Sequence, residues 1–569
     1  MKSIYKLLAI GALAVSATTS CLDLSPKDSL ASSDLWGQPA DFQNFANKFY
    51  DWLPNYGMIY ADNFHCDRHS DFLRDKNSRD DISAGRHTVP ESDGDYTGSY
   101  DHIRRCNLLI QNAAGYGAQD DIRQPLGEAY FFRAYSYMTL LYKFGDAIIV
   151  DVPIDTDDPR MNAKRDDRAK VAEFIIEDLR KAAGLLLPTA DVAEGRVGSE
   201  GAWGMLSRVA LFEGTWQIYH KGNTEAGRKF CSEAAEAAKK VMDGGKFQLF
   251  YNATLGDASQ KYMFILENET CNGAGLTKAD NKEYIIKRCF DPVLKPGKRN
   301  VSKEVFFNAS YVSSHLADLY LCQDGLPIDK SGVFKGRDRM VSEWQNRDHR
   351  MRYTLCQPGD NFWNNEKSRI DWSDSDEEIA AAARRNNVPS GGTGYYPQKW
   401  SVERKCVDET QSFDWPVLRY AEVLLNYAEA VYERDGGKIS DDDLNISLNL
   451  TRRRVNKDMP ALTNAFAAQH GLDIREEIRR ERSIELFQEG FRLDDLRRWK
   501  TAEIEMPKDI TGIVWTGEWE TKWASPGPLD KDGRVLVEGN RQFEQKHYLF
   551  PLPSSQLQLN PNLGQNPGW

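Results

Sequence analysis

Residues 415–437 read WPVLRYAEVLLNYAEAVYERDGG, and this stretch decides the fold class. From Tyr420 to Val431, apolar side chains recur at i, i+3, i+4, i+7, i+8 and i+11, which places them on one face of an α-helix. Gly436 and Gly437 end the run. Because a helix with one apolar face cannot bury that face alone, the stretch predicts a helix that packs against other helices.

Other segments of the same helical character form two blocks, at about 39–245 and 415–500. In the first block, the sequence pattern predicts long helices at 126–144, 201–220 and 225–243. Small residues stand where neighbouring helices would touch, as in tetratricopeptide-like pairs that stack into one core. We therefore predict a mainly α fold, with a tetratricopeptide-like scaffold of helical pairs, long irregular loop insertions and little β-structure.

Long irregular stretches separate the two blocks and follow the second. They contain half of the 14 tryptophans, together with several glycine and proline turns. Because loops of this length in a compact protein usually carry function, we expect ligand-binding insertions at about 55–97 and 246–414. The stretch 503–569 should form an extended C-terminal tail over the core. We expect all of these parts to belong to a single domain, 39–569.

Charge and motif content narrow the classes of function. The 569-residue chain has a net charge of -12 and would repel phosphate backbones, so no nucleic-acid partner is expected. The sequence has no P-loop, G-x-G-x-x-G, G-x-S-x-G or H-E-x-x-H motif, so nothing in it supports an enzyme. A pair of carboxylates could serve a glycoside hydrolase, but 85 acidic residues single out no pair.

The N-terminus has the pattern of an export signal. Residues 1–20, MKSIYKLLAIGALAVSATTS, join two lysines to an apolar run that is too short to span a bilayer. Cys21 follows a small residue and begins a polar stretch, 21–38, which is typical of a lipoprotein tether. We predict that Cys21 is lipidated, which would anchor the protein to a membrane. The alternative is ordinary cleavage that leaves Cys21 as a free thiol.

Two short clusters resemble metal sites but lack the required spacing. His65 and His69 lie four residues apart in a loop-like segment without a second ligand pair, and the acidic run 91–95 lacks the closing glutamate of a calcium loop. We expect no metal site and no cofactor, while a structural calcium and the pairing of the cysteines stay open. The charged run 479–498 has the spacing of ion pairs between helices; a carboxylate-binding arginine site is the alternative.

Five passages, in order from end to end, resemble the SusD/RagB family of bacterial outer-membrane lipoproteins. The passages are Cys21-Leu22-Asp23; Gly127-Glu128-Ala129 through Arg133-Ala134-Tyr135 to Phe144-Gly145-Asp146 and Val152-Pro153; Leu418-Arg419-Tyr420-Ala421-Glu422-Val423 to Asn426-Tyr427-Ala428-Glu429-Ala430; Glu481-Arg482, Glu485-Leu486, Glu489-Gly490 and Asp494 to Trp499; and Leu549-Phe550-Pro551-Leu552-Pro553 with 560–569.

This resemblance implies a lipid-anchored outer-membrane protein that faces the extracellular side. It implies a SusC-like TonB-dependent transporter as the partner, over which the protein sits as a lid. Members of the family capture oligosaccharides or polysaccharides and perform no chemistry, so a non-catalytic glycan-binding protein is expected. A surface lipoprotein for peptides or glycoproteins is an alternative, and a glycoside hydrolase is another.

The resemblance also indicates where the ligand binds, in the early loop and the central insertions. Aromatic rings there could cover the apolar C–H faces of sugars while polar groups bind hydroxyls. Tyr395 and Tyr396 follow Gly391-Gly392-Thr393-Gly394 and are expected to project from a flexible loop. The candidate glycan-binding residues are Asp62, Asn63, His65, Asp67, Tyr96, Tyr284, Phe290, Trp363, Arg369, Tyr395 and Tyr396.

Overall fold

The computed structural model of the chain shows a mainly α fold, as the sequence predicts. The predicted signal and Cys21 lie outside the part of the chain that the structure describes. The described residues are 36–59, 63–75, 79–295, 297, 301–305, 310–339, 341–356, 392–402, 409–517 and 527–569.

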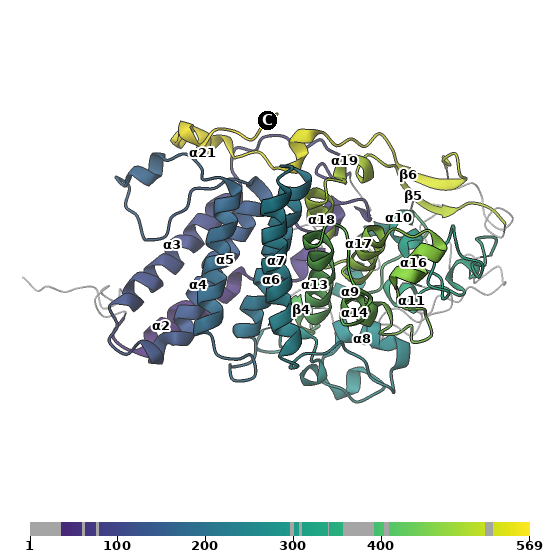
Figure 1. Ribbon diagram of the computed structural model, residues 1–569, viewed down its shortest axis with the longest axis horizontal. Helices are drawn as coiled ribbons and strands as arrows, with labels where there is room; N and C mark the ends of the chain where they lie inside the picture. The colour runs from purple at the N-terminus through teal and green to yellow at the C-terminus, as the bar shows by residue number, and fades with distance from the viewer. Residues whose placement is uncertain are drawn as a thin grey trace, which may run out of the picture.

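Long helices stand side by side in one half of the molecule (Figure 1), and each packs on its neighbour in sequence. Beyond them, α13 packs on α7 and α17 packs on α13, so the second block continues the same array. The bounds of these helices are α2 Pro39–Asn47, α3 Gly94–Ala114, α4 Arg123–Phe144, α5 Arg168–Leu185, α6 Ser199–Tyr219, α7 Thr224–Asp243, α13 Tyr420–Arg434 and α17 Ile474–Glu485.

Glycines allow these helices to approach closely. A Cβ atom added at Gly214 in α6 would lie 2.6 Å from the Sγ of Cys231 in α7, and one added at Gly227 in α7 would lie 2.8 Å from the carbonyl oxygen of Gly214. Real Cβ atoms do not reach such distances without movement of the neighbour. The small residues seen in the sequence therefore mark helix contacts, as predicted.

Shorter helices lie mostly in the other half of the molecule, whereas α21 (Ser554–Leu559) lies over the long helices (Figure 1). Their bounds are α8 Ser259–Ile265, α9 Val301–Glu304, α10 Ser314–Leu319, α11 His349–Thr354, α14 Asp441–Asn445, α15 Leu448–Arg452, α16 Asn464–His470, α18 Arg492–Arg498, α19 Ala502–Glu505 and α21 Ser554–Leu559. Single 3-10 turns connect several of them, including Gly256–Ala258 and Ser342–Trp344.

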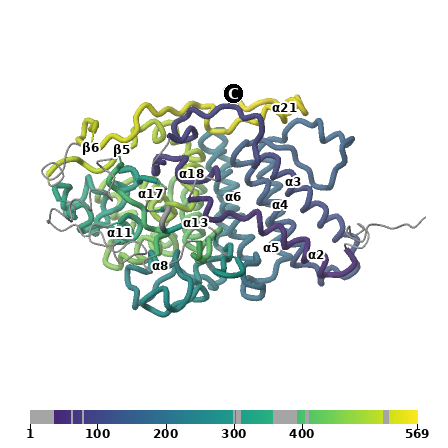
Figure 2. The backbone as a smooth tube through the Cα atoms, turned by 180° about the vertical axis from the view of Figure 1, so that it is seen from behind, coloured from purple at the N-terminus to yellow at the C-terminus, as the bar shows by residue number. Residues whose placement is uncertain are grey.

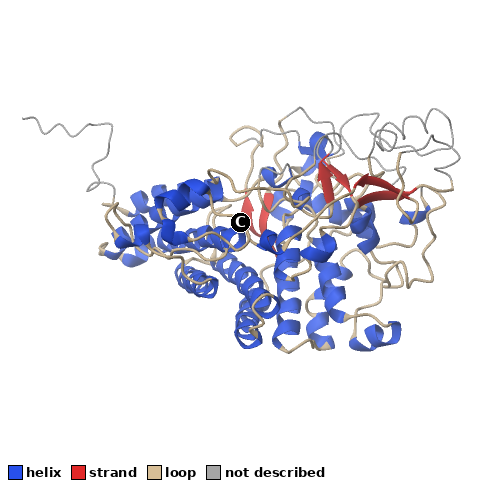
Figure 3. Ribbon diagram, turned by 90° about the horizontal axis from the view of Figure 1, so that it is seen from above, coloured by secondary structure: helices blue, strands red, loops and turns tan. Residues whose placement is uncertain are grey.

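The described strands form three small antiparallel pairs, drawn red in Figure 3. They are β1 Leu73–Asp75 with β3 Ser310–Val312, β2 Tyr284–Arg288 with β4 Trp415–Arg419, and β5 Ile510–Val514 with β6 Arg534–Glu538. The first five residues of the fold-deciding stretch thus form strand β4, and the helix begins at Tyr420. Pro416 cannot donate a helical hydrogen bond, whereas in β4 it pairs in register with Lys287.

Two groups of buried side chains make up the apolar interior. The larger runs from Phe42 in α2 to Leu563 near the C-terminus and includes most of the helical array. The smaller joins residues from the insertions, among them Phe72, Tyr320 and Tyr395, with Ile513 of β5. The insertions therefore pack around apolar side chains of their own.

The charged run 479–498 forms buried ion pairs, as its spacing predicts. The Nε of Arg482 donates to Asp495 at 2.8 Å, and the Nη1 of Arg498 in α18 donates to Glu429 of α13 at 2.6 Å. All four side chains are buried. These contacts tie α13, α17 and α18 together, so the run is part of the scaffold.

The C-terminal tail crosses the top of the helical array, in yellow in Figures 1 and 2. The backbone N–H of Phe550 donates to the carbonyl of Lys143, and the Nδ2 of Asn566 donates to the carbonyl of Phe144, at 2.8 and 3.0 Å. The indole of Trp569 donates to two backbone carbonyls of the tail and is half-buried. These contacts hold the last part of the tail against the helical array, whereas its first part contains α19 and the pair of β5 with β6.

Two further observations bear on the sequence analysis. Within the described ranges, none of the helices combines the length and the apolar character that crossing a bilayer requires. Of the described cysteines, Cys106, Cys231, Cys289 and Cys322 are free thiols.

Candidate functional site

A polar hollow of about 250 Å³ lies at α11, inside the second predicted insertion. We call it the α11 hollow. It combines two aromatic side chains with charged and amide groups. Its lining residues are Asp257, Gln323, Trp344, Asn346, Arg347, Asp348, His349, Arg352 and Tyr353.

A sharp turn and a helix cap position these side chains. Asn346 adopts a left-handed conformation, with φ 55°, which asparagine tolerates better than most residues. The chain then turns inward, where the Nη2 of Arg347 donates to the carbonyls of Ala317 and Tyr320 at 2.6 and 2.9 Å. Asp348 caps α11 by accepting from the backbone N–H of Arg350 at 2.9 Å. The segment 346–353 is thus fixed on both sides of the turn.

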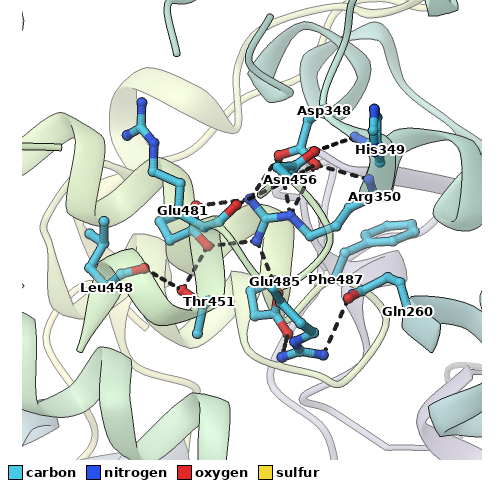
Figure 4. A network of polar contacts seen from close by, with 12 residues as sticks. Gln260, Asp348, His349, Arg350, Leu448, Thr451, Asn456, Glu481, Glu485 and Phe487 are labelled. Atoms are coloured by element: carbon cyan, nitrogen blue, oxygen red, sulfur yellow. Dashed lines mark hydrogen bonds and ion pairs between the residues drawn. The ribbon is translucent and has the colours of Figure 1, made fainter. Parts of the chain in front are cut away.

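A buried ion network holds α11 from below (Figure 4). The guanidinium of Arg350 is fully buried and donates to the carboxylates of Asp348, Glu481 and Glu485 at 2.6–3.2 Å. Two of these carboxylates belong to α17, so the network joins the hollow to the scaffold. The side chains that line the hollow are therefore presented by a helix with little freedom to shift.

The network also sets the charge of one lining residue. Burial alone would raise the pKa of the Asp348 carboxyl, but the charge and hydrogen bonds of Arg350 outweigh burial and hold that pKa below its ordinary value. Asp348 therefore stays ionised and cannot act as a proton donor near neutral pH. Of the two lining carboxylates, only Asp257 lies outside the network.

Asp257 and His349 face each other at the mouth of the hollow. The Nδ1 of His349 lies 2.6 Å from a carboxylate oxygen of Asp257, and both side chains are about two-fifths exposed. The backbone N–H of His349 donates to Asn456 at 2.8 Å, which fixes the start of α11. The hollow thus offers positively and negatively charged groups beside the aromatic rings of Trp344 and Tyr353.

The structure brings two predicted site residues together, but away from this hollow. Asn63 and His65 line a smaller internal cavity of about 60 Å³ between the helices, where the Nδ1 of His65 contacts Asp494 of α18. His69 instead contacts Asp80 through its own Nδ1. The two imidazoles therefore engage different carboxylates and share no metal-like arrangement.

Asp67 is a corrected expectation. Its side chain is buried and accepts hydrogen bonds from the backbone N–H groups of Gln488 and Arg492, at 2.6 and 3.2 Å. Burial raises the pKa of this carboxyl to about 7. The carboxylate satisfies the backbone between α17 and α18 and presents no surface to a ligand.

Tyr395 and Tyr396 do not project from a flexible loop, so that expectation is wrong. Tyr395 is only 1% exposed, packs in the smaller apolar group, and donates its hydroxyl to both oxygens of Glu343 at 2.9 and 3.0 Å. Tyr396 is buried as well. The insertions have a core of their own, and these rings are part of it.

The remaining candidates are dispersed. Tyr96 is buried and lines a separate groove of about 730 Å³ beside α3. Tyr284 donates its hydroxyl to the carbonyl of Met263 at 2.9 Å, and the ring of Phe290 stacks on Tyr56 with 4.6 Å between centroids. The candidates that lie outside the described residues are Asp62, Trp363 and Arg369.

The sequence analysis missed the residues of the α11 hollow. A usable signal was the run 344–353, WQNRDHRMRY, which concentrates aromatic, amide and charged side chains inside an expected binding insertion. Such a mixture is unusual for a buried segment. The concentration of such side chains in this run indicated the binding site better than the glycines before Tyr395 did.

Ammonium groups occupy the acidic clusters that could otherwise hold a metal. Among the described residues, one set of potential ligand atoms lies within 4.8 Å of one another, on Glu194, Cys289 and Asp414. The Nζ of Lys287 donates to both carboxylates of that set, at 2.6 and 2.9 Å. The acidic run 91–95 behaves likewise, since Lys143 donates to two of its aspartates. These lysines supply the positive charge that a cation would bring.

Comparison with known proteins agrees with this architecture. A sequence model described as "SusD family" matches residues 264–569, more than half of the chain. The chain belongs to the SusD family. A second model of the same kind, described as "Starch-binding associating with outer membrane", matches residues 21–211 of this SusD-family protein.

Solved structures share the fold at low sequence identity. A SusD-like carbohydrate-binding protein from Bacteroides fragilis is 22% identical, with a TM-score of 0.72, over 93% of this chain and 100% of that one. A SusD homologue from Bacteroides thetaiotaomicron is 21% identical, with a TM-score of 0.66, over 95% and 99%. No curated protein matches the sequence.

Proposed function

We propose that this SusD-family protein is a non-catalytic surface lipoprotein that captures oligosaccharides or polysaccharides and delivers them to a TonB-dependent transporter. The observation that carries the proposal is the α11 hollow. Its two aromatic rings suit the apolar faces of sugar rings, and its charged and amide groups suit hydroxyls. Eight of its nine lining residues lie within the region that matches the family, 264–569.

Rigidity supports the same role. Because Arg350 ties α11 to α17, a ligand would meet side chains that are already in place, and little conformational entropy would be lost on binding. Glycoside hydrolysis usually needs two carboxylates with separate protonation states. In the α11 hollow, Asp348 is paired with a buried arginine, which favours binding over hydrolysis.

The cellular setting is proposed on different grounds. The N-terminal match carries a description of outer-membrane association, and the sequence pattern predicts lipidation at Cys21. An anchored protein that captures glycans at the outer membrane needs a transporter to move its ligand inward. We therefore infer a SusC-like partner, which crosslinking in native membranes followed by identification of the captured protein would test.

Calorimetry against a panel of soluble polysaccharides tests glycan capture. We expect one glycan class to bind, and Trp344→Ala and Tyr353→Ala each to weaken binding by roughly tenfold or more, as for central aromatic contacts. Tyr130→Ala, a half-buried ring on α4 in the helical array, is the matched control and should bind as the wild type.

Two measurements complete this test. Trp344 is half-buried against the smaller apolar group, so Trp344→Ala could lose affinity through poor folding. Tyr353→Ala, which does not remove a ring from that group, separates such a loss from the loss of a ligand contact. A reducing-sugar assay should detect no product from the bound glycan. Unchanged affinity in both aromatic variants, or turnover of the glycan, would contradict the proposal.

A further inference from the structure

Among the described residues, Val293 and Leu294 are the most exposed large apolar side chains, followed by Leu559. Val293 is 82% exposed and Leu294 is 88% exposed, whereas Leu559 is 73% exposed. They are adjacent in sequence and lie inside a tight turn that Asp291 and Lys295 close. We call these two residues the aliphatic tip.

The turn holds the tip in its exposed position. Asp291 and Lys295 exchange two backbone hydrogen bonds at 2.9 and 3.2 Å. The carboxylate of Asp291 also accepts from the backbone N–H groups of Val293 and Leu294, at 2.8 and 2.7 Å. The polar groups of the turn are therefore satisfied locally, and the side chains of the tip point away from the protein without any unfolding.

The base of the turn is fixed to the protein interior. The ring of Phe290 stacks on Tyr56, and the Nζ of Lys278 donates to the carbonyl of Phe290 at 2.6 Å. On the other side, Gly297 approaches so closely that an added Cβ would lie 2.7 Å from the ring of Tyr56. Both ends of the segment thus meet the same buried tyrosine, which makes the tip a projection on a rigid base.

A cationic hollow of about 270 Å³ adjoins the tip through Lys295. Lys287 and Arg196, which also line it, are already paired with carboxylates. Arg288 and Lys295 form no ion pair with a carboxylate among the described residues. The Nη1 of Arg288 donates to the backbone carbonyls of Asp51 and Leu53, while its buried Nε has no partner in the described structure.

This hollow is an exception in an acidic protein. The whole chain has a net charge of -12, whereas the hollow has four basic lining residues and one acidic one, Glu194. Its wall includes Asn47 of α2 and the segment just after it, so it lies beside the first described helix. A surface that joins exposed aliphatic groups to uncompensated positive charge complements a ligand with an apolar part and an anionic part.

We propose that the aliphatic tip and the cationic hollow bind the surface of a membrane that contains phosphate-bearing lipids. Val293 and Leu294 enter the boundary of the acyl chains, and Arg288 and Lys295 hold a lipid phosphate. The description of the family model that matches 21–211 places such proteins at an outer membrane, so a lipid surface is at hand. This contact is separate from glycan capture and from any acyl chain on Cys21, and it would orient the protein on the membrane.

Co-sedimentation with lipid vesicles tests the proposal. The protein is residues 21–569 with Cys21→Ser, so that no attached lipid contributes. Vesicles of phosphatidylglycerol mixed with phosphatidylcholine are compared with vesicles of phosphatidylcholine alone. We expect binding to the anionic vesicles that weakens with added salt, and a loss of roughly tenfold or more in the double variant Val293→Asp/Leu294→Asp.

Two further variants separate the two parts of the surface. Arg288→Gln/Lys295→Gln should remove the preference for anionic vesicles. Leu559→Asp, at another exposed leucine, should bind as the wild type, and circular dichroism checks that each variant folds. The proposal is overturned if the wild type ignores both kinds of vesicle, or if the double aspartate variant binds equally well.

Two other outcomes would also overturn it. If inorganic phosphate alone displaces the protein from anionic vesicles at concentrations that leave the ionic strength unchanged, the hollow is a site for small anions. If vesicles do not bind but Val293→Asp/Leu294→Asp prevents crosslinking to a membrane protein in native membranes, the tip docks on a protein. Glycan affinity, measured on the same variants, should not change.

Discussion

Arg350→Met should destabilise the fold strongly, because this side chain neutralises buried carboxylates. Glu485 would keep two arginine partners, Arg419 and Arg454. Asp348 and Glu481 would lose the only ion-pair partner that the structure gives them among the described residues. Breaking one buried pair by removing one partner typically costs about 3–5 kcal/mol, so we expect a loss at the upper end of this range or beyond. That is a large part of the roughly 5–15 kcal/mol by which proteins are stable.

Urea denaturation followed by tryptophan fluorescence measures this loss, and calorimetry with the bound glycan measures its effect on α11. The matched control is Arg352→Met, two residues further along the same helix, where the side chain is exposed and lines the hollow. Arg352→Met should weaken glycan binding with less than about 0.5 kcal/mol of change in stability. If Arg350→Met unfolds at the same urea concentration as the wild type, the network does not stabilise the protein and our account of α11 fails.

Three further predictions concern the scaffold. Tyr395→Phe should cost about 1–3 kcal/mol of stability in urea denaturation by leaving a buried carboxylate without its hydroxyl donor, while glycan affinity stays unchanged. Gly214→Ala should lower stability by about 1–3 kcal/mol in the same assay, since the added methyl would meet Cys231; unchanged stability would mean that α6 and α7 separate easily. Glu429 should contribute to acid sensitivity: burial raises its pKa, but Arg498 outweighs burial and lowers that pKa to about 2 from 4.5. The ionised form is favoured in the fold, so about 3 kcal/mol of stability is present above roughly pH 4.5 and is lost as the pH falls towards 2. Urea titrations across this range should show a smaller slope for Glu429→Gln, and an equal slope would contradict the assignment.

The helical scaffold was largely predictable because its signal is local. The segments 126–144, 201–220 and 225–243 match α4, α6 and α7 to within a few residues, since glycines and caps mark their ends. The start of α13 was less clear, because residues 415–419 are apolar in a way that suits either a strand or a helix. These residues form strand β4 because they pair with β2, which lies more than a hundred residues earlier in the chain.

The candidate site was less predictable, for a physical reason. Loop aromatics can serve a ligand or a core, and the sequence does not reveal that the insertions bury an apolar group of their own around Tyr320 and Tyr395. The expectation for Asp67 failed for the same reason: in a sequence, an aspartate that accepts backbone hydrogen bonds cannot be told from one that binds a sugar. The α11 hollow depends on Asp257, which lies almost a hundred residues before the run 344–353.

The seam between the tail and α4 has a consequence for how the protein is made. The last carbonyls of α4, on Lys143 and Phe144, find their donors in Phe550 and Asn566, about four hundred residues later. Because the ribosome synthesises Phe550 and Asn566 near the end of translation, the C-terminal end of α4 gains these hydrogen bonds only when almost the whole chain has been made. An affinity tag fused directly after Trp569 would lie beside these contacts between the tail and α4 and could weaken them.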